Sequence, residues 1–392
     1  MTFQEYRFRN VASLINGRAY LMPELQDSGK YKIVRVGNFT GKDEWFFSDM
    51  ELEPEKYCEN GDLLYKWACT FGPEIWKGDK TIYHYHIWKV LCNPVLLDKT
   101  YFFYYLKYYT PLWLSGTNGA TMVHITKASM EKKKLYLPTL PQQQKIASIL
   151  SAYDSQIENN QKRIKLLEQM AENLYKEWFV RFRFPGYESA EFKDGTPIGW
   201  KDLQAQDVFN ITIGRTPSRK VFEFFSTERE NNCSWISISD MKNGMFIKDT
   251  SEYLTPEALK ACNMPMVKAN TVLLSFKLTV GKVAISLEET STNEAIAHFN
   301  TDDHTLKEYT YLYLKCFNYS KLGNTSAIGN AINSTIVKNM SFILPSKDII
   351  LEFHKQAKPL FDGILNLTQQ ISSLTHQRDL LLPRLMSGKL SI

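Results

Sequence analysis

The feature that most constrains the fold is a long amphipathic segment in the middle of the chain. Residues 148–178 read SILSAYDSQIENNQKRIKLLEQMAENLYKEW, with apolar residues at steps of three and four. That spacing places them on one narrow stripe of a helix, as in a coiled coil. Asn160 is the one strongly polar residue there, and a single buried Asn commonly fixes coiled-coil register. A stripe this narrow requires a partner helix. The positions that define it include Leu150, Ile157, Asn160, Ile164, Leu167 and Leu174.

The chain supplies this partner helix itself. Residues 125–138 align without a gap with residues 332–345, and the same alignment carries the stripe into the C-terminal segment. Arg378 interrupts the second stripe. A repeat of this length is too long for a solenoid and fits a duplicated unit made of a domain and a helix. The second stripe includes Ile364, Ile371, Leu374 and Leu381.

The repeat reaches further back in each half. Gly17-Arg18 matches Gly214-Arg215, and residues 63–72 resemble residues 272–281. The chain is therefore expected to alternate globular domain, long helix, globular domain, long helix. The predicted boundaries are 1–140 for the first domain, 141–185 for the first helix, 186–345 for the second domain and 346–392 for the second helix.

Within the two domains the pattern is α+β. Short β-branched and aromatic runs predict strands, and two longer tyrosine-rich runs predict one helix in each half. A segment rich in Pro and Gly, residues 182–201, predicts the linker that leaves the first long helix. The predicted strands lie in residues 31–37, 80–90, 234–240 and 282–287, and the predicted helices in 98–109 and 305–317.

Composition limits the class of protein only loosely. The net charge of +5 permits a nucleic-acid partner without requiring one. The six cysteines form no C-x-x-C pair, which favours reduced core thiols and a cytoplasmic protein. The start MTFQEYRFRNVASL carries charges through its mildly apolar run, so no signal peptide is expected. No stretch of about 18 apolar residues predicts a membrane span.

Three segments carry a resemblance to a known family. The block LPTLPQQQKIASILSAYDSQIENNQKRIKLLEQMAENLYKEWFVRFRFPG, with GKYKIVRVGNFTG and LLLPRLMSGKL, resembles the specificity subunit of type I restriction-modification enzymes. The resemblance implies two similar globular α/β target-recognition domains, separated and joined by two long antiparallel coiled-coil helices with a pseudo-two-fold internal repeat. One departure is that the second helix carries Pro359 and Pro383 and lacks the Gln-Gln lead-in, which predicts a start or a kink near Pro359.

The resemblance also implies a function. The chain would recognise a bipartite double-stranded DNA sequence with a fixed spacer and direct two methyltransferase subunits, together with restriction subunits when these are present. An alternative is a non-catalytic scaffold or phase-variable cassette that binds the methyltransferase without competent DNA reading. A fragment of a fused restriction-methylation enzyme is a further alternative, which the length of the chain disfavours.

Catalytic motifs are absent from the sequence. There is no G-x-x-x-x-G-K-S/T loop, no G-x-G-x-x-G turn, no Asn-Pro-Pro-aromatic motif, no H-E-x-x-H and no paired cysteine site. We therefore expect no catalytic residue, no metal site and no cofactor on this chain. S-adenosylmethionine, ATP and Mg are expected on the partner subunits, as the resemblance implies.

Candidate DNA-contacting residues lie where the halves match in position but differ in chemistry. Arg18 and Arg215 each follow a matched glycine, and each would either donate to guanine in the major groove or pair with a carboxylate. Other candidates flank the matched Gly72 and Gly281 on strands expected to be half exposed: Lys66, Trp67, Lys277, Thr279 and Lys282. Asn38 and Ser239 follow matched strands, and Arg219 completes the set.

His84 and His86 alternate along one predicted strand and are therefore expected on the same side of it. They would ligate a metal only with a third ligand, which no residue at suitable spacing supplies. Two further interpretations are a DNA-facing pair and ordinary strand filling.

The two long helices are expected to space two recognition domains along DNA. A helix of about 37 residues spans roughly 55 Å. One chain would then read two short sequences that are separated by a fixed number of unread base pairs.

Overall fold

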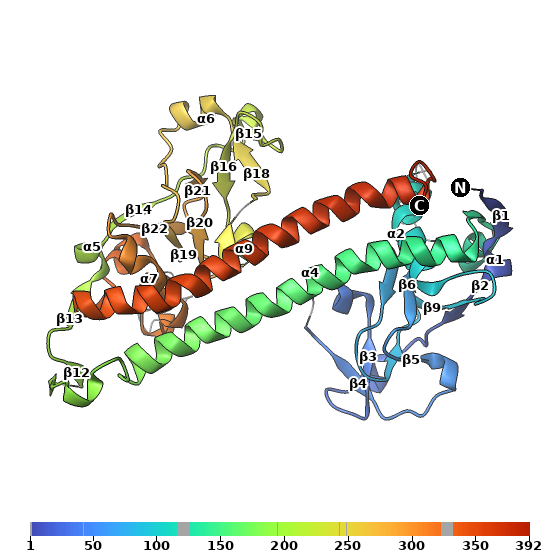
Figure 1. Cartoon of the computed structure of the whole chain (residues 1–392), viewed down its shortest axis with the longest axis horizontal. Coiled ribbons are helices and arrows are strands. Elements are labelled where there is room, and N and C mark those ends of the chain that lie inside the picture. The colour runs from blue at the N-terminus through green and yellow to red at the C-terminus, as the bar shows by residue number, and fades with distance from the viewer. Residues whose placement is uncertain are drawn as a thin grey trace. The chain divides into compact units, whose positions relative to one another are not determined.

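The computed structural model describes residues 2–41, 43–115, 125–193, 195–242, 244–247, 249–322 and 332–392. The chain divides into two compact units. Unit 1 comprises Met1–Asn159 and Ile371–Ile392, and unit 2 comprises Asn160–Gln370. Each unit contains one globular domain and one half of each long helix, α4 (Leu140–Tyr175) and α9 (Lys347–Met386) (Figure 1). The predicted order of domain, helix, domain, helix is confirmed.

Unit 1 is built on two four-stranded sheets and one strand pair. The first sheet is fully antiparallel, in the order β2 (Ala12–Asn16), β9 (Ile87–Cys92), β6 (Leu63–Lys66), β7 (Gly72–Ile75). The second has the order β4 (Phe46–Ser48), β3 (Tyr31–Val34), β8 (Thr81–Tyr83), β5 (Tyr57–Cys58), and its β3–β8 pair is parallel. The remaining strands and shorter α-helices are β1 (Gln4–Arg7) paired with β10 (Lys134–Leu137), α1 (Phe8–Val11), α2 (Lys99–Ser115) and α3 (Lys127–Lys132).

Unit 2 has a corresponding arrangement. Its first sheet has the order β14 (Asn210–Ile213), β22 (Ile296–Asn300), β19 (Val272–Ser275), β20 (Val283–Ser286), β17 (Phe246–Ile247). Its second has the order β15 (Phe225–Ser226), β18 (Glu252–Leu254), β16 (Cys233–Ile236), β21 (Ser291–Thr292), and β16–β21 is parallel like β3–β8. The remaining strands are the pairs β11 (Phe192–Lys193) with β12 (Thr196–Pro197) and β13 (Lys201–Gln204) with β23 (Ser341–Leu344), and the shorter α-helices are α5 (Ala205–Val208), α6 (Pro256–Ala261), α7 (Lys307–Cys316) and α8 (Ser334–Lys338).

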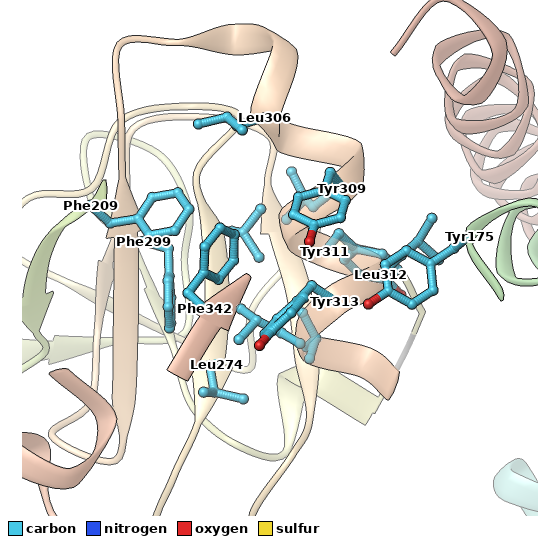
Figure 2. Packing of buried hydrophobic residues seen from close by; sticks show 14 of the residues in the cluster. Tyr175, Phe209, Leu274, Phe299, Leu306, Tyr309, Tyr311, Leu312, Tyr313 and Phe342 are labelled. Atoms are coloured by element: carbon cyan, nitrogen blue, oxygen red, sulfur yellow. The ribbon is translucent and has the colours of Figure 1, made fainter. Parts of the chain in front are cut away.

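The two tyrosine-rich runs form the predicted helices α2 and α7, and both are core elements. Figure 2 shows Tyr309 and Tyr313 of α7 beside Phe342 of β23, with Tyr175 of α4 on the other side of Tyr309. The Tyr309 hydroxyl donates to the Ile343 carbonyl at 2.5 Å, and the Tyr313 hydroxyl donates to the Ser341 carbonyl at 2.9 Å. The phenols thus provide apolar area and also satisfy strand carbonyls, which fixes α7 against β23.

The first long helix begins at a capped end. The Thr139 backbone N–H donates to Oε1 of Gln142, the reciprocal contact of a capping box. Gln143 is buried, and its Nε2 donates to the carbonyls of Leu96 and Pro138. The Gln-Gln lead-in therefore fastens the helix start to the first domain.

The stripe predicted for the coiled coil is only partly buried. Leu150, Asn160 and Ile364 are buried, and the other predicted positions are half-buried, namely Ile157, Ile164, Leu167, Leu174, Ile371, Leu374 and Leu381. In unit 2, Asn160 is fully buried and donates to Gln370, and Leu167 packs against Gly363. Since 160 faces 370 and 167 faces 363, the two segments run antiparallel. In unit 1, Arg378 interrupts the second stripe as expected, and its guanidinium pairs with Asp154 at 2.5 Å.

One of the two alternatives predicted for the second long helix, a start near Pro359, was wrong. Helix α9 begins at Lys347, well before Pro359, and continues through Pro383. Pro359 lies on the exposed face, where water can hydrogen-bond the carbonyl that lacks its usual N–H partner. Phe353, Ala357 and Phe361 are buried on either side of the proline, so burial of apolar area offsets the cost of the lost hydrogen bond.

In the segment predicted as a linker, residues 182–201, several aromatic side chains pack within unit 2. Trp200 contacts the rings of Phe179, Phe182 and Phe184 at centroid distances of 5.4 to 5.7 Å. The six cysteines are free thiols, but Cys69 is exposed and only Cys58 is fully buried, so the expectation of core thiols holds in part. Across the described residues, no helix combines the length and apolarity that a membrane span requires.

Candidate nucleic-acid interface

Each unit places a glycine directly under a turn. A Cβ at Gly17 would lie 2.3 Å from the Tyr83 carbonyl oxygen, and a Cβ at Gly214 would lie 2.5 Å from the Thr292 carbonyl oxygen. Any side chain at either position would therefore displace the turn. The match between Gly17-Arg18 and Gly214-Arg215, seen first in the sequence, reflects one shared requirement for close approach.

These glycines support the turn between β8 and β9 in unit 1 and the turn between β21 and β22 in unit 2. The backbone N–H of Arg18 donates to Tyr83, and that of Arg215 donates to Thr292. At the other end of each turn, the backbone N–H of Trp67 donates to the His86 carbonyl, and that of Phe276 donates to the Ala295 carbonyl. The same hydrogen bonds therefore hold residues 84–86 and residues 293–295.

A second loop in each unit, residues 67–71 or 276–280, adjoins that turn. Cys69 has a φ of 65° and Leu278 a φ of 61°, so each loop holds a non-glycine residue in the left-handed region. That conformation costs a residue with a Cβ roughly 1–2 kcal/mol. Leu278 is 98% exposed, which is extreme for a leucine, and Cys69 is also exposed. Both loops thus display a side chain on a strained backbone.

The third shared element is the turn after the parallel strand. Oδ1 of Asn38 accepts from the backbone N–H of Arg35 at 2.8 Å, and Oδ2 of Asp240 accepts from the backbone N–H of Ser237 at 2.8 Å. Asn38 and Asp240 are therefore equivalent, and both stabilise the backbone of their turn. Ser239 is exposed beside Asp240 and shares a hydrogen bond with the Ser237 hydroxyl at 2.6 Å.

The arginine candidates are all engaged within the chain. Arg18 forms a two-pronged pair with Glu24 at 2.6 and 3.1 Å, and this hydrogen bonding lowers the pKa of Glu24. Arg219 forms a similar pair with Glu252 at 2.6 and 2.7 Å. Arg215 donates from Nη1 to the carbonyls of Cys262 and Asn263. Of the two interpretations left open, carboxylate pairing therefore describes Arg18, whereas Arg215 is exposed and bonded to backbone carbonyls.

Lys66 and Trp67 differ from the expectation of a half-exposed strand. Lys66 is 7% exposed and pairs with Glu74 at 2.6 Å, because β6 is a central strand covered on both faces. Trp67 stacks on Trp88 with centroids 5.7 Å apart, and its indole N–H donates to the Tyr85 carbonyl at 2.8 Å. The prediction of half exposure was wrong for Lys66, and Trp67 supports the neighbouring turn.

His84 and His86 lie close together, with ring centroids 4.9 Å apart, but not on one strand. Strand β8 ends at Tyr83 and β9 begins at Ile87, because the Ile87 N–H closes a turn onto the His84 carbonyl. Burial, with smaller effects of His86 and Arg35, lowers the pKa of His84 to about 4. Within the described part of the chain, no three His, Cys, Asp or Glu side chains are placed to hold a metal ion.

A hollow of about 480 Å³ brings several of the unit 1 candidates together. It is lined by Asn38, His84 and His86 with Arg35, Cys69 and Thr70. In unit 2, Lys277, Thr279 and Lys282 are exposed around Leu278. They lie on the loop between β19 and β20 and not on half-exposed strands as expected, since both strands are buried. The sequence comparison overlooked Tyr85, Leu278 and Glu294, although the alignment of 63–72 with 272–281, continued in register, pairs Tyr85 with Glu294.

The fold and these loops define a class of protein. It is a duplicated α+β binding module in which each copy is followed by a long helix and presents equivalent loops with different side chains. The family model described as the type I restriction modification DNA specificity domain matches residues 1–169 and 197–374. The chain belongs to this family, which confirms the identification as a specificity subunit and the two-repeat fold.

Named relatives agree with this assignment. The chain is 26% identical to the type I restriction enzyme HindI specificity subunit of Haemophilus influenzae, over 71% of this chain and 73% of that protein. It is 25% identical to the MjaIX specificity subunit of Methanocaldococcus jannaschii, over 76% of this chain and 70% of that protein. The crystal structure of an S subunit from M. genitalium shares the fold, with a TM-score of 0.61, 14% identity and coverage of 98% and 96% of the two chains.

Proposed function

We propose that each unit binds one half of a bipartite double-stranded DNA sequence, and that the chain itself catalyses no reaction. The observation that carries the proposal is the pair of equivalent turns, held by the same backbone hydrogen bonds but displaying different side chains. A duplicated module that reads two unlike sequences needs a constant backbone and variable polar groups at its surface. The cations Arg35, Lys277 and Lys282 would contact phosphates beside these turns.

The proposed contact residues follow from this arrangement. In unit 1 they are the turn at 84–86 and the rim of the hollow next to it, including Arg35. In unit 2 they are Ser239, Lys277, Thr279 and Lys282 with Leu278, and also Arg215, which is exposed and bonded to backbone carbonyls. Arg18, Asn38, Lys66, Trp67 and Arg219 are bonded within the protein and are assigned to supporting the loops.

Chemistry is assigned to partner subunits. Two methyltransferase subunits would use S-adenosylmethionine, and restriction subunits, where present, would use ATP and Mg. The M. jannaschii and H. influenzae relatives are named as specificity subunits of restriction enzymes, which supports a role within a larger assembly on DNA. We expect this assembly to be cytoplasmic. We expect the purified chain alone to show no methylation, cleavage or ATP hydrolysis. S-adenosylmethionine-dependent methylation by the chain alone would contradict this.

A module exchange tests the proposal. Residues 200–331 would be replaced by the corresponding region of a relative, and the target determined by selecting bound duplexes from a random library in the presence of the methyltransferase. We expect one half of the target to change and the other to remain. The reciprocal replacement within residues 1–140 provides the matched control and should change only the other half.

Two outcomes would contradict the proposal. A change in both halves after a single exchange would show that the two units do not read independently. Binding of the methyltransferase without any sequence-dependent DNA binding would favour the alternative, a scaffold that lacks competent DNA reading.

A further inference from the structure

Tyr85 and Glu294 are the middle residues of the two equivalent turns. One is an uncharged aromatic residue and the other a carboxylate. Tyr85 is 37% exposed, and Glu294 is also exposed. The two residues occupy the same place in corresponding turns. We infer that this position determines sequence specificity in each unit, and that Glu294 accepts a hydrogen bond from the exocyclic amino group of a base in the major groove.

The equivalence rests on hydrogen bonds that surround the turn. His84 and Asn293 each donate their backbone N–H to the preceding parallel strand, at Val34 and Ile236, both at 3.0 Å. Their carbonyls accept from Ile87 at 3.0 Å and Ile296 at 3.3 Å. Together with the contacts from the glycine loop and from the neighbouring loop, these bonds fix the backbone of both turns in one conformation.

The first residue of each turn has a structural role in spite of its different chemistry. Oδ1 of Asn293 accepts from the backbone N–H of Ala295 at 3.1 Å, and Nδ1 of His84 faces the backbone N–H of His86 at 3.5 Å. Asn and His thus serve the same local purpose, the stabilisation of a tight turn. Variation at this first position is explained by the turn itself.

The third residue also has a packing role. Ala295 is 4% exposed, and His86 contacts the Trp67 ring with centroids 5.3 Å apart. The second residue is exposed in both units, on a backbone that is already stabilised. Glu294 is exposed, and Tyr85 remains 37% exposed although its ring packs beside those of His84 and His86, with centroids 4.6 and 3.8 Å away. A tyrosine in one unit and a glutamate in the other therefore change what the turn offers to a ligand without changing the turn.

Glu294 is poorly explained as a non-specific DNA contact. A carboxylate repels phosphates, so a glutamate on a DNA-facing turn is favourable only where it meets a hydrogen-bond donor. In the major groove the donors are the amino groups of cytosine and adenine, and glutamate commonly accepts from cytosine. The Thr216 hydroxyl hydrogen-bonds Glu294, which orients the carboxylate before DNA binds. Tyr85 has no charge and would select a different base.

This inference rests on the proposed function, and its test uses single substitutions in the full chain assembled with its methyltransferase. Bound duplexes are selected from a random library for the parent protein, Glu294→Ala, Glu294→Gln and Tyr85→Ala. Glu188→Ala, an exposed glutamate in the same unit at 187–189, is the control. The denaturation midpoint of each variant is recorded to confirm the fold.

We expect Glu294→Ala to lose its preference at one base pair, where the parent discriminates by about 5- to 150-fold. Glu294→Gln should alter the preferred base there, Tyr85→Ala should affect only the other half of the target, and Glu188→Ala should match the parent. An unchanged target for Glu294→Ala, or equal weakening on all sequences, would overturn the inference. If the parent itself selects no sequence, the proposed function fails, and the inference fails with it.

Discussion

Asn160 donates a hydrogen bond from its side-chain amide to Oε1 of Gln370, at 3.1 Å, across the seam of the two long helices. Asn160 is fully buried, and Gln370, on the facing helix, is exposed. A polar residue at a core position lowers stability but disfavours alternative registers, because any shift leaves its amide without a partner. This contact is therefore the element of the helix pair that specifies register most directly.

Replacement of Asn160 by leucine should separate stability from register. Asn160→Leu is expected to leave the free energy of unfolding unchanged or raise it by up to about 1 kcal/mol, because Gln370 can turn to water. Register should become less strict. Oxidative cross-linking between Leu167→Cys and Gly363→Cys, which face each other in the parent, should become less complete in the Asn160→Leu background. Undiminished cross-linking would show that the apolar seam alone fixes the register.

Lengthening both helices tests whether they set the DNA spacer. One heptad would be inserted after Leu167 and one after Gly363, at facing positions that keep the seam inward. Seven residues add about 10 Å, close to three base pairs. Three base pairs also rotate the groove by about 100°. We expect weak binding that is partly restored on targets with a spacer longer by about three base pairs, as selection among random spacers would reveal. An unchanged preferred spacer would exclude the helices as its determinant.

Replacing Leu278 by glycine tests whether its exposed side chain contributes to DNA binding. Because its φ of 61° suits glycine, Leu278→Gly should change the free energy of unfolding by less than about 1 kcal/mol. DNA affinity should fall, since the substitution removes the exposed apolar side chain between Lys277 and Thr279. Ile198→Ala, at an exposed position in the 182–201 segment, is the control and should bind normally. Normal DNA affinity of Leu278→Gly would remove this loop from the interface.

His298 should make unit 2 sensitive to acid. It is fully buried between the hydroxyls of Thr212 and Thr292, at 2.8 and 2.7 Å, and burial lowers its pKa from 6.5 to about 4. The unfolded chain therefore binds the proton more tightly. Neutral His298 therefore makes its full contribution to the free energy of unfolding above pH 6.5. That free energy falls by about 3 kcal/mol as the pH decreases to about 4.

Denaturation measured from pH 7 to pH 4 checks this expectation. His298→Gln should show a shallower loss of stability than the parent, whereas the exposed His304→Gln should follow the parent. Some loss should persist in His298→Gln because the pKa of His84 is lowered in the same direction. Equal slopes for the parent and His298→Gln would contradict the assignment.

Much of the architecture follows from sequence periodicity. The stripe through Leu150, Asn160 and Leu167 requires a long helix with a partner, and the repeat identifies that partner because heptad spacing constrains a helix whatever surrounds it. The matched glycines at 17 and 214 were visible for a similar reason, since close backbone approach admits no other residue. Pro359 was a poor predictor of where the second long helix begins, because burial of Phe353 and Phe361 offsets the hydrogen bond that the proline removes.

The candidate interface depended on tertiary structure. Sequence patterns cannot tell whether an arginine meets DNA or a carboxylate, and only the fold brings Glu24 to Arg18 and Glu252 to Arg219. Likewise, a run of alternating histidines has the pattern of a strand until the Ile87 N–H closes a turn on the His84 carbonyl. Local periodicity determined the helices and the duplication, whereas contacts between residues distant in sequence decided which polar side chains are paired within the protein and which, like Glu294 beside Thr216, also remain exposed.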